Sequence, residues 1–442
     1  MRRREPVTLI GGGLAGSEAA LQLAARGHSV RLFEMRPTKS TEAHKSGDLA
    51  EIVCSNSFKS ERDDTAAGVL KLELDLLGCR LLDFARRARV PAGAALAMDR
   101  ERFSGAVTSA LLQSPHLSVV REEARRIPAE RPCIIATGPL TSAALQEELA
   151  RLLGEEALYF YDAIAPSVLL DSVDREIAFK AARYEKGEAD YYNCPLNKEE
   201  YEHFVDELLA ADRVQPKDFE KAAYFQGCMP IEAIAEGGRE SLRFGPMRPV
   251  GLQDPRSGRR PWAVVQLRQE TLDGTLFGLV GFQTQLKYPD QRRIFSLIPG
   301  LERAEFARLG SLHRNTFINS PKHLDEKLQL RGQDGLHLAG QMIGCEGYVE
   351  SIATGLLAAL AVHARQSDLP FAPPPRESIL GSLLAYLRQN TAQRPSPMNV
   401  NFGLLPPLSE RIRSKRERKL ALAERAVRAM RAWREEFAAL FD

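Results

Sequence analysis

The chain has 442 residues, of which 44% are hydrophobic and 27% charged, with a formal net charge of +2. This composition is ordinary for a globular protein, and the length predicts two or three domains. The first residues, MRRREPVTLIGGG, lack the apolar run of a signal peptide, and the apolar stretch GLLAALAV is too short to cross a bilayer. The sequence therefore predicts a cytoplasmic protein with no membrane partner.

Residues 7–34 predict a nucleotide-binding unit. An apolar run at 7–10 leads into a glycine-rich turn, an alanine-rich helix to Arg26, and a second strand at 30–33. This order of strand, glycine turn, helix, strand and acidic residue is the context that a bare G-x-G-x-x-G motif lacks. We expect a dinucleotide to bind at the start of the helix.

Each glycine of this turn has a physical role in the prediction. Gly11 permits the tight turn, Gly13 lets the backbone approach a pyrophosphate, and Gly16 lets the helix pack closely on the strand. The helix N-terminus faces the anion, and Glu34 accepts hydrogen bonds from a ribose. The predicted contacts are Gly11, Gly12, Gly13, Leu14, Ala15, Gly16 and Glu34.

Two later segments favour FAD as the dinucleotide. RPCIIATGPLTS predicts a strand that ends at Thr137 and Gly138, an A-T-G turn typical of two-dinucleotide-fold flavoproteins. GLHLAGQMIGCEGYVESIATGLLAALAV predicts a strand that enters Gly340, a glycine-rich turn and a long apolar helix. The predicted fold class is therefore α/β, with a Rossmann-like FAD-binding domain.

A second domain is expected between these segments. The FAD-binding domain is predicted to comprise residues 1–140 and 331–442, and residues 141–330 an inserted α/β domain. Short β-like runs such as WAVVQLR and LFGLVGF predict an antiparallel component in the insert.

The cysteines leave two interpretations open. They are Cys54, Cys79, Cys133, Cys194, Cys228 and Cys345. No pair has C-x-x-C spacing, so the sequence predicts neither a zinc site nor a thioredoxin-like redox pair. Cys228 stands in a turn between Gly227 and Pro230, and Cys54 lies in EIVCSNSFKS. Each cysteine is either a packing residue or a candidate nucleophile.

The C-terminal segment is basic. From residue 376 onward there are 13 Lys and Arg against 7 Asp and Glu. A long helix is predicted after Ser409, and its start is crowded with positive charge, which the helix dipole disfavours. This basic segment comprises Arg411, Arg413, Lys415, Arg416, Arg418 and Lys419. It is either a site for a polyanion such as a phosphate backbone or a solvated helix face.

Several motifs together resemble one family. They include IGGGLAGSEAA, EIVCSNSFKS, YFQGCMPIE, LRFGPMRPVGL, LVGFQTQLKY, LHLAGQMIGCEGYVESIATG and MNVNFGLLPPL, spread over nearly the whole chain. In this combination the chain resembles the folate- and FAD-dependent tRNA (uracil-5-)-methyltransferases, the TrmFO family, which is related to the GidA/MnmG flavoproteins. One departure is Tyr288, where the family usually has tryptophan.

The resemblance implies a chemistry. Reduced FAD takes the methylene group of 5,10-methylenetetrahydrofolate and passes it to C5 of uridine 54 in the T loop of tRNA, and NAD(P)H supplies the electrons. A thiolate must add to C6 of the uracil before C5 can attack the one-carbon unit. The resemblance implies Cys228 as that thiolate and Cys54 as its partner in proton removal, or the exchanged roles.

The remaining expected contacts concern cofactor and substrate. Gly340 and Gln341 are expected to contact the cofactor, and Tyr348 to position the flavin or folate. Tyr288 is expected to stack on a base or pterin, whereas His313 either stacks on folate or is a structural histidine. Arg413, Lys415 and Arg416 are expected to bind tRNA phosphates. Two alternatives stay open: a related FAD-dependent protein that modifies the wobble uridine, and a flavin- and RNA-binding protein without turnover. The sequence sets neither the oligomeric state nor the choice between NADH and NADPH.

Overall fold

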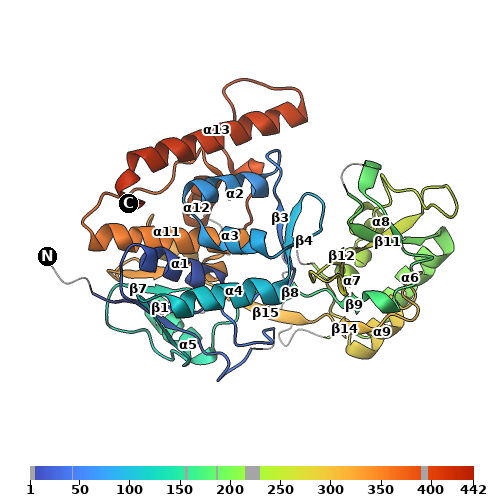
Figure 1. Cartoon of the computed structure of the whole chain (residues 1–442), viewed down its shortest axis with the longest axis horizontal. Coiled ribbons are helices and arrows are strands. Elements are labelled where there is room, and N and C mark those ends of the chain that lie inside the picture. The colour runs from blue at the N-terminus through green and yellow to red at the C-terminus, as the bar shows by residue number, and fades with distance from the viewer. Residues whose placement is uncertain (1–4, 42, 155–157, 186–187, 215–228, 390–396) are drawn as a thin grey trace.

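The protein folds into two lobes with a small two-stranded sheet between them (Figure 1). The computed structural model describes residues 5–41, 43–154, 158–185, 188–214, 229–389 and 397–442. Within those ranges, every helix is too short or too polar to cross a membrane.

The first lobe is built on a five-stranded sheet with the order β16-β7-β1-β2-β6, in which every pair is parallel. The strands are β1 (Val7–Ile10), β2 (Val30–Phe33), β6 (Leu117–Val120), β7 (Cys133–Ile135) and β16 (Leu336–Leu338). The central strands β1 and β7 are buried throughout, as expected for a parallel sheet covered on both faces. The predicted Rossmann-like fold class is confirmed.

Two helices from distant parts of the sequence pack directly on each other beside this sheet. They are α1 (Leu14–Ala25) and α11 (Tyr348–Gln366), both rich in alanine and each with a single glycine. At their contact a Cβ on Gly355 would lie 2.1 Å from the carbonyl oxygen of Ala15, so only glycine fits there. This packing brings the two glycine-rich turns to the same edge of the sheet.

The rest of the first lobe surrounds these elements. A three-stranded antiparallel sheet contains β3 (Ser57–Ser60), β5 (Ala95–Met98) and β4 (Arg89–Val90), in that order. The other helices are α2 (Ala66–Leu76), α3 (Arg80–Arg87), α4 (Arg100–Gln113), α5 (Ala143–Leu153), α10 (Ser320–His323), α12 (Ile379–Gln389) and α13 (Lys415–Glu436).

The second lobe has its own core around a six-stranded antiparallel sheet with the order β10-β11-β12-β13-β9-β14. Its strands are β9 (Ser167–Leu169), β10 (Phe179–Lys180), β11 (Tyr191–Leu196), β12 (Ala263–Gln269), β13 (Leu276–Leu279) and β14 (Phe306–Arg308). Its helices are α6 (Lys198–Ala210), α7 (Ile231–Glu236), α8 (Ser241–Phe244) and α9 (Tyr288–Phe295). Strands β8 (Leu158–Ala163) and β15 (Leu312–Phe317) form the two-stranded sheet between the lobes.

The two cores occupy separate stretches of the chain. Buried apolar residues of the second core run from Val168 to Leu301, whereas Leu149 and Ile318 on either side belong to the first core. The domain boundaries expected at residues 141 and 330 remain a prediction.

Helix α13 lies along the outside of the first lobe, over α2 (Figure 1). It begins at Lys415, later than the sequence predicts, and Ser414 is its N-cap through a hydrogen bond from the Glu417 N–H. The preceding chain is extended and is held by Arg425, which donates to the carbonyl oxygens of Pro406 and Pro407. The buried face of the helix is Leu422, Ala423, Ala426, Met430 and Trp433.

Candidate active site

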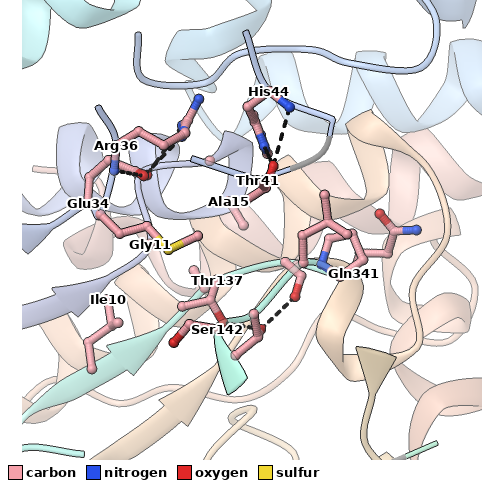
Figure 2. Close-up of a pocket in the computed structure, with 18 of the residues that line it drawn as sticks. Ile10, Gly11, Ala15, Glu34, Arg36, Thr41, His44, Thr137, Ser142 and Gln341 are labelled. Carbon is pink, nitrogen blue, oxygen red and sulfur yellow. Dashed lines mark hydrogen bonds and ion pairs between the residues drawn. The ribbon is translucent and has the colours of Figure 1, made fainter. Parts of the chain in front are cut away.

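The carboxyl ends of β1 and β7 open into a cavity of about 150 Å³, which we name the dinucleotide cavity (Figure 2). The sequence-predicted residues that line it are Gly11, Gly13, Leu14, Ala15, Glu34, Thr137, Gly138, Gly340, Gln341 and Tyr348. Segments near residues 12, 137 and 340 thus meet at one site.

Glycine is required for a different physical reason at each position of the first turn. Gly11 has a φ of +101°, and a Cβ there would lie 2.6 Å from the Ala136 carbonyl oxygen. A Cβ on Gly16 would lie 1.9 Å from the carbonyl oxygen of Gly11. Gly13 differs, because its φ is −73° and a Cβ there would meet no protein atom within 4 Å. Its Cβ would enter the cavity, so only a bound ligand requires glycine at this position.

Glu34 is held firmly at the end of β2. Its carboxylate accepts hydrogen bonds from the Gly12 N–H at 2.9 Å and from the Arg36 N–H and Nε at 2.9 and 3.0 Å. Burial alone would raise the pKa of Glu34, but the charge and hydrogen bonds of Arg36 hold it below its ordinary value. Glu34 is therefore ionised and already engaged by the protein, and sequence reasoning missed its partner Arg36.

Further polar side chains line the dinucleotide cavity. The Thr41 hydroxyl lies 2.6 Å from Nδ1 of His44, and the Thr137 hydroxyl lies 2.6 Å from that of Thr141 (Figure 2). Gly340 and Gln341 also line the cavity, and so does Tyr348, the first residue of helix α11. The arrangement fits a long ligand with polar groups along its length, as a dinucleotide has.

A neighbouring cavity contains Cys54, and we name it the cysteine cavity. It shares Val53, Pro139, Leu140, Gln341 and Tyr348 with the dinucleotide cavity.

Tyr348 connects the two sites. Its hydroxyl oxygen accepts hydrogen bonds from the Cys54 N–H at 2.7 Å and the Ser55 N–H at 3.2 Å. Tyr348 therefore borders the dinucleotide cavity and fixes the backbone of the cysteine loop.

Cys54 differs from the other described cysteines in its exposure. Cys79, Cys133, Cys194 and Cys345 are buried, whereas the Cys54 side chain is partly exposed. Burial raises the pKa of Cys133 and of Cys345 to about 12, so both thiols stay protonated at neutral pH. Of the cysteines in the described ranges, Cys54 alone has the accessibility that a nucleophile needs.

The remaining predicted site residues are placed as follows. Cys228 lies outside the described residues. His313 is on β15, where its backbone pairs with Asp162. Tyr288 begins α9 and is 58% exposed, and it lines neither cavity. The basic segment is largely exposed, and its Arg413, Lys415 and Arg416 form no ion pair with any described residue.

Sequence reasoning missed several charged groups beside Cys54. Lys59 and Glu350 line the cysteine cavity, with Lys59 Nζ 3.2 Å from a carboxylate oxygen of Glu350. Lys59 has a φ of +61°, a strained conformation for a residue with a side chain. Its presence in EIVCSNSFKS, five residues after Cys54, was the available signal. Arginines from the second lobe also reach the Cys54 loop, and nothing in the sequence pattern marked them.

Comparisons with known proteins agree with this geometry. The family model described as glucose inhibited division protein A, GIDA, matches residues 6–370. The solved structure of Aquifex aeolicus GidA in its form II crystal is similar with a TM-score of 0.71 and 16% identity, covering 98% of this chain and 73% of that one. The fold and the site thus define a protein of the GidA flavoprotein class.

Relatives with much higher identity specify the family further. Proteins named methylenetetrahydrofolate--tRNA-(uracil-5-)-methyltransferase TrmFO from Geobacter sulfurreducens and Heliobacterium modesticaldum are 53% and 52% identical to this chain. Each match covers 97% of this chain and 98% of the relative. The TrmFO protein of Aquifex aeolicus is 51% identical over 98% of this chain. The chain belongs to the TrmFO family of tRNA (uracil-5-)-methyltransferases.

Proposed function

We propose that this protein methylates C5 of uridine 54 in the T loop of tRNA in the cytoplasm, using FAD, 5,10-methylenetetrahydrofolate and NAD(P)H. The observation that carries the proposal is the position of Cys54. Its partly exposed thiol borders a cavity that shares five lining residues with the dinucleotide cavity. A thiol that acts on uracil and a cofactor that delivers one carbon must meet at such a junction.

The residues of the dinucleotide cavity fit FAD. The open space at Gly13 and the N-terminus of α1 accommodate a pyrophosphate, and Thr137, Gly138 and Gly340 border the path beyond it. FAD bound there and reduced by NAD(P)H would carry the one-carbon unit from the folate and supply the electrons that make it a methyl group. Glu34 contributes by fixing the glycine turn through the Gly12 N–H.

The two cysteines act on the uracil ring. One thiolate forms a bond to C6, and the electron pair of the C5–C6 double bond moves to give an enolate whose C5 attacks the one-carbon unit. A base then removes the C5 proton, and elimination of the thiolate from C6 restores the double bond. We assign the addition to Cys228 and the assistance in proton removal to Cys54, which Tyr348 holds by its backbone N–H.

The basic segment at the start of α13 supports binding of tRNA. Its side chains project from the surface, and the two that bracket the N-cap, Arg413 and Lys415, have no acidic partner within the described part of the chain. Phosphates would offset their repulsion and the unfavourable helix dipole.

A reconstituted reaction tests the function. Protein, FAD, NADPH, methylenetetrahydrofolate and an unmodified full-length tRNA should yield 5-methyluridine at position 54, and omission of any one component should abolish it. RNA with C54 in place of U54 is the matched control and should remain unmodified. Methylation at the anticodon wobble position instead would contradict the proposal.

A further inference from the structure

The loop that carries Cys54 is held from three directions by arginines. Arg100, the first residue of α4, donates to the carbonyl oxygens of Ile52 and Val53 at 3.3 and 3.1 Å and approaches that of Cys54 at 3.5 Å. Arg308 on β14 donates to the Val53 carbonyl oxygen at 3.4 Å. The backbone on the amino side of the thiol is therefore fixed by guanidinium groups from both lobes.

Arg268 on β12 holds the other side of the loop. Its Nη2 donates to the Ser55 hydroxyl and its Nε to the Asn56 side-chain oxygen, both at 2.9 Å. Asn56 is buried and donates in turn to the carbonyl oxygens of Met98 and Gln269. Arg268 also lines the cysteine cavity itself.

The positive charge of these three arginines is not balanced by the carboxylates around them. Within the described ranges, the one carboxylate at ion-pair distance from them is Glu270, 3.0 Å from Arg100 and 3.4 Å from Arg308. Burial would raise the pKa of Glu270, but the three arginines hold it below its ordinary value, so it is ionised. Three guanidinium groups against one carboxylate leave an excess of two positive charges.

The donors of the cluster are also in excess. Nε of Arg100 and Nε of Arg308 are buried and have no hydrogen-bond partner among the described residues. Glu270 is 4% exposed and fully engaged, with Ser167 donating to its second oxygen, and Gly278 leaves room for its side chain. A structural ion-pair network satisfies its members, whereas this one has an excess of positive charge, and Arg268 and Arg308 interact electrostatically with Cys54.

We propose that Arg100, Arg268 and Arg308, balanced by Glu270, are positioning residues that hold the Cys54 loop and stabilise the thiolate of Cys54. This inference rests on the proposed function, in which Cys54 takes part in the chemistry. Because Arg268, Arg308 and Glu270 belong to the second lobe, docking of that lobe on the first is what makes Cys54 reactive. The insert thus does more for the site than carry Cys228.

Other ionisable groups also face the thiol and its arginines. Tyr348 interacts electrostatically with Cys54, and Tyr191 with Arg268. Lys45 interacts electrostatically with Arg100 and Arg308, and Glu51 interacts with Lys45. Lys59, Glu346 and Glu350 line the cysteine cavity. A test must therefore change the cluster alone and leave these groups in place.

The test measures alkylation of Cys54 by iodoacetamide at pH 7 in the FAD-loaded protein, followed by mass spectrometry of the Cys54 peptide. Arg268→Gln removes one positive charge and should slow alkylation about tenfold. Glu270→Gln removes the one carboxylate found at ion-pair distance from the arginines in the described part of the chain and should accelerate alkylation. Arg256→Gln is the matched control, since Arg256 is an exposed arginine of the same lobe that pairs with Asp254, and its rate should equal that of the wild type.

The opposite signs of the two expected rate changes distinguish an electrostatic effect on Cys54 from a loss of order in its loop. Disorder of the loop alone would change alkylation in the same direction in both variants, and that result, or equal rates in all proteins, would overturn the inference. If Glu270→Gln fails to fold, Arg268→Lys replaces it; it keeps the charge and should react at least about threefold faster than Arg268→Gln. Methylation of tRNA by the Cys54→Ala variant is measured in a separate assay. A failure of the proposed function can therefore be told apart from a failure of the inference about the arginines.

Discussion

Gly13 and Gly16 offer a matched pair of substitutions that separates cofactor binding from folding. In Gly16→Ala the new Cβ would stand 1.9 Å from the backbone oxygen of Gly11, which no side-chain rotation can relieve. Overpacking of this kind costs about 1–3 kcal/mol or more, a large share of the roughly 5–15 kcal/mol that stabilises a typical domain.

Gly13→Ala carries almost no such cost. The new Cβ meets nothing within 4 Å and the φ of −73° suits alanine. Loss of a favourable N-cap residue and the reduced entropy of the unfolded chain have opposite signs and each amounts to about 0.5–1 kcal/mol. The stability of the protein without cofactor should therefore change by less than about 1 kcal/mol, while the methyl group occupies space that the pyrophosphate needs.

Thermal unfolding of the cofactor-free protein and titration with FAD measure both effects. Gly13→Ala should unfold at the wild-type temperature and bind FAD at least about tenfold more weakly, with Gly13→Val weaker still. Gly16→Ala should unfold several degrees lower. Wild-type FAD affinity in Gly13→Val would refute the reasoning that places the pyrophosphate against this turn.

Three other predictions concern the thiols, the RNA and pH. With 5-fluorouridine at position 54, the Cys228→Ala variant should form no covalent protein–RNA adduct, whereas the Cys54→Ala variant should still form one without methylating the RNA. The reverse pattern would exchange the roles of the two cysteines. Methylation at nearly the wild-type rate by both variants would contradict the two-cysteine mechanism. Neutralising four residues of the basic segment (Arg413, Lys415, Arg416 and Arg418) should weaken tRNA binding and flatten its salt dependence at unchanged FAD content, whereas an unchanged salt slope would make the segment a solvated helix face. Burial raises the pKa of Glu73 from 4.5 to about 8, so the folded protein keeps a proton that the unfolded chain releases. The contribution of Glu73 to stability is full below pH 4.5 and is lost as the pH rises through 8. The Glu73→Gln substitution should therefore reduce the slope of unfolding free energy against pH by up to about 1.4 kcal/mol per pH unit. Parallel curves for the wild type and the variant would contradict this prediction.

Local motifs made much of the fold predictable. The strand–turn–helix unit at residues 7–34, the strand before Thr137 and the long helix after Gly340 all stand where their patterns place them. Each depends on interactions between residues near in sequence, such as glycine conformation and apolar periodicity. The start of α13 was placed several residues early, because its N-cap at Ser414 competes with an equally suitable serine at 409.

The surroundings of Cys54 could not be predicted in the same way. Arg268 and Arg308 lie more than 200 residues from the loop they hold, and charged side chains in strands usually indicate a solvated face. Their role emerges only when the second lobe packs on the first and brings β12 and β14 against residues 52–56. Likewise, Glu34 was expected to bind a ribose directly, and its engagement by Arg36 depends on how the chain turns after β2.

The source of the methyl carbon tests the central claim most directly. Protein, unmodified full-length tRNA, FAD and NADPH are incubated with isotopically labelled 5,10-methylenetetrahydrofolate or with S-adenosylmethionine labelled in its methyl group. We expect label at C5 of uridine 54 from the folate and none from S-adenosylmethionine. Label that arrives only from S-adenosylmethionine, or equal labelling with and without FAD, would contradict the account.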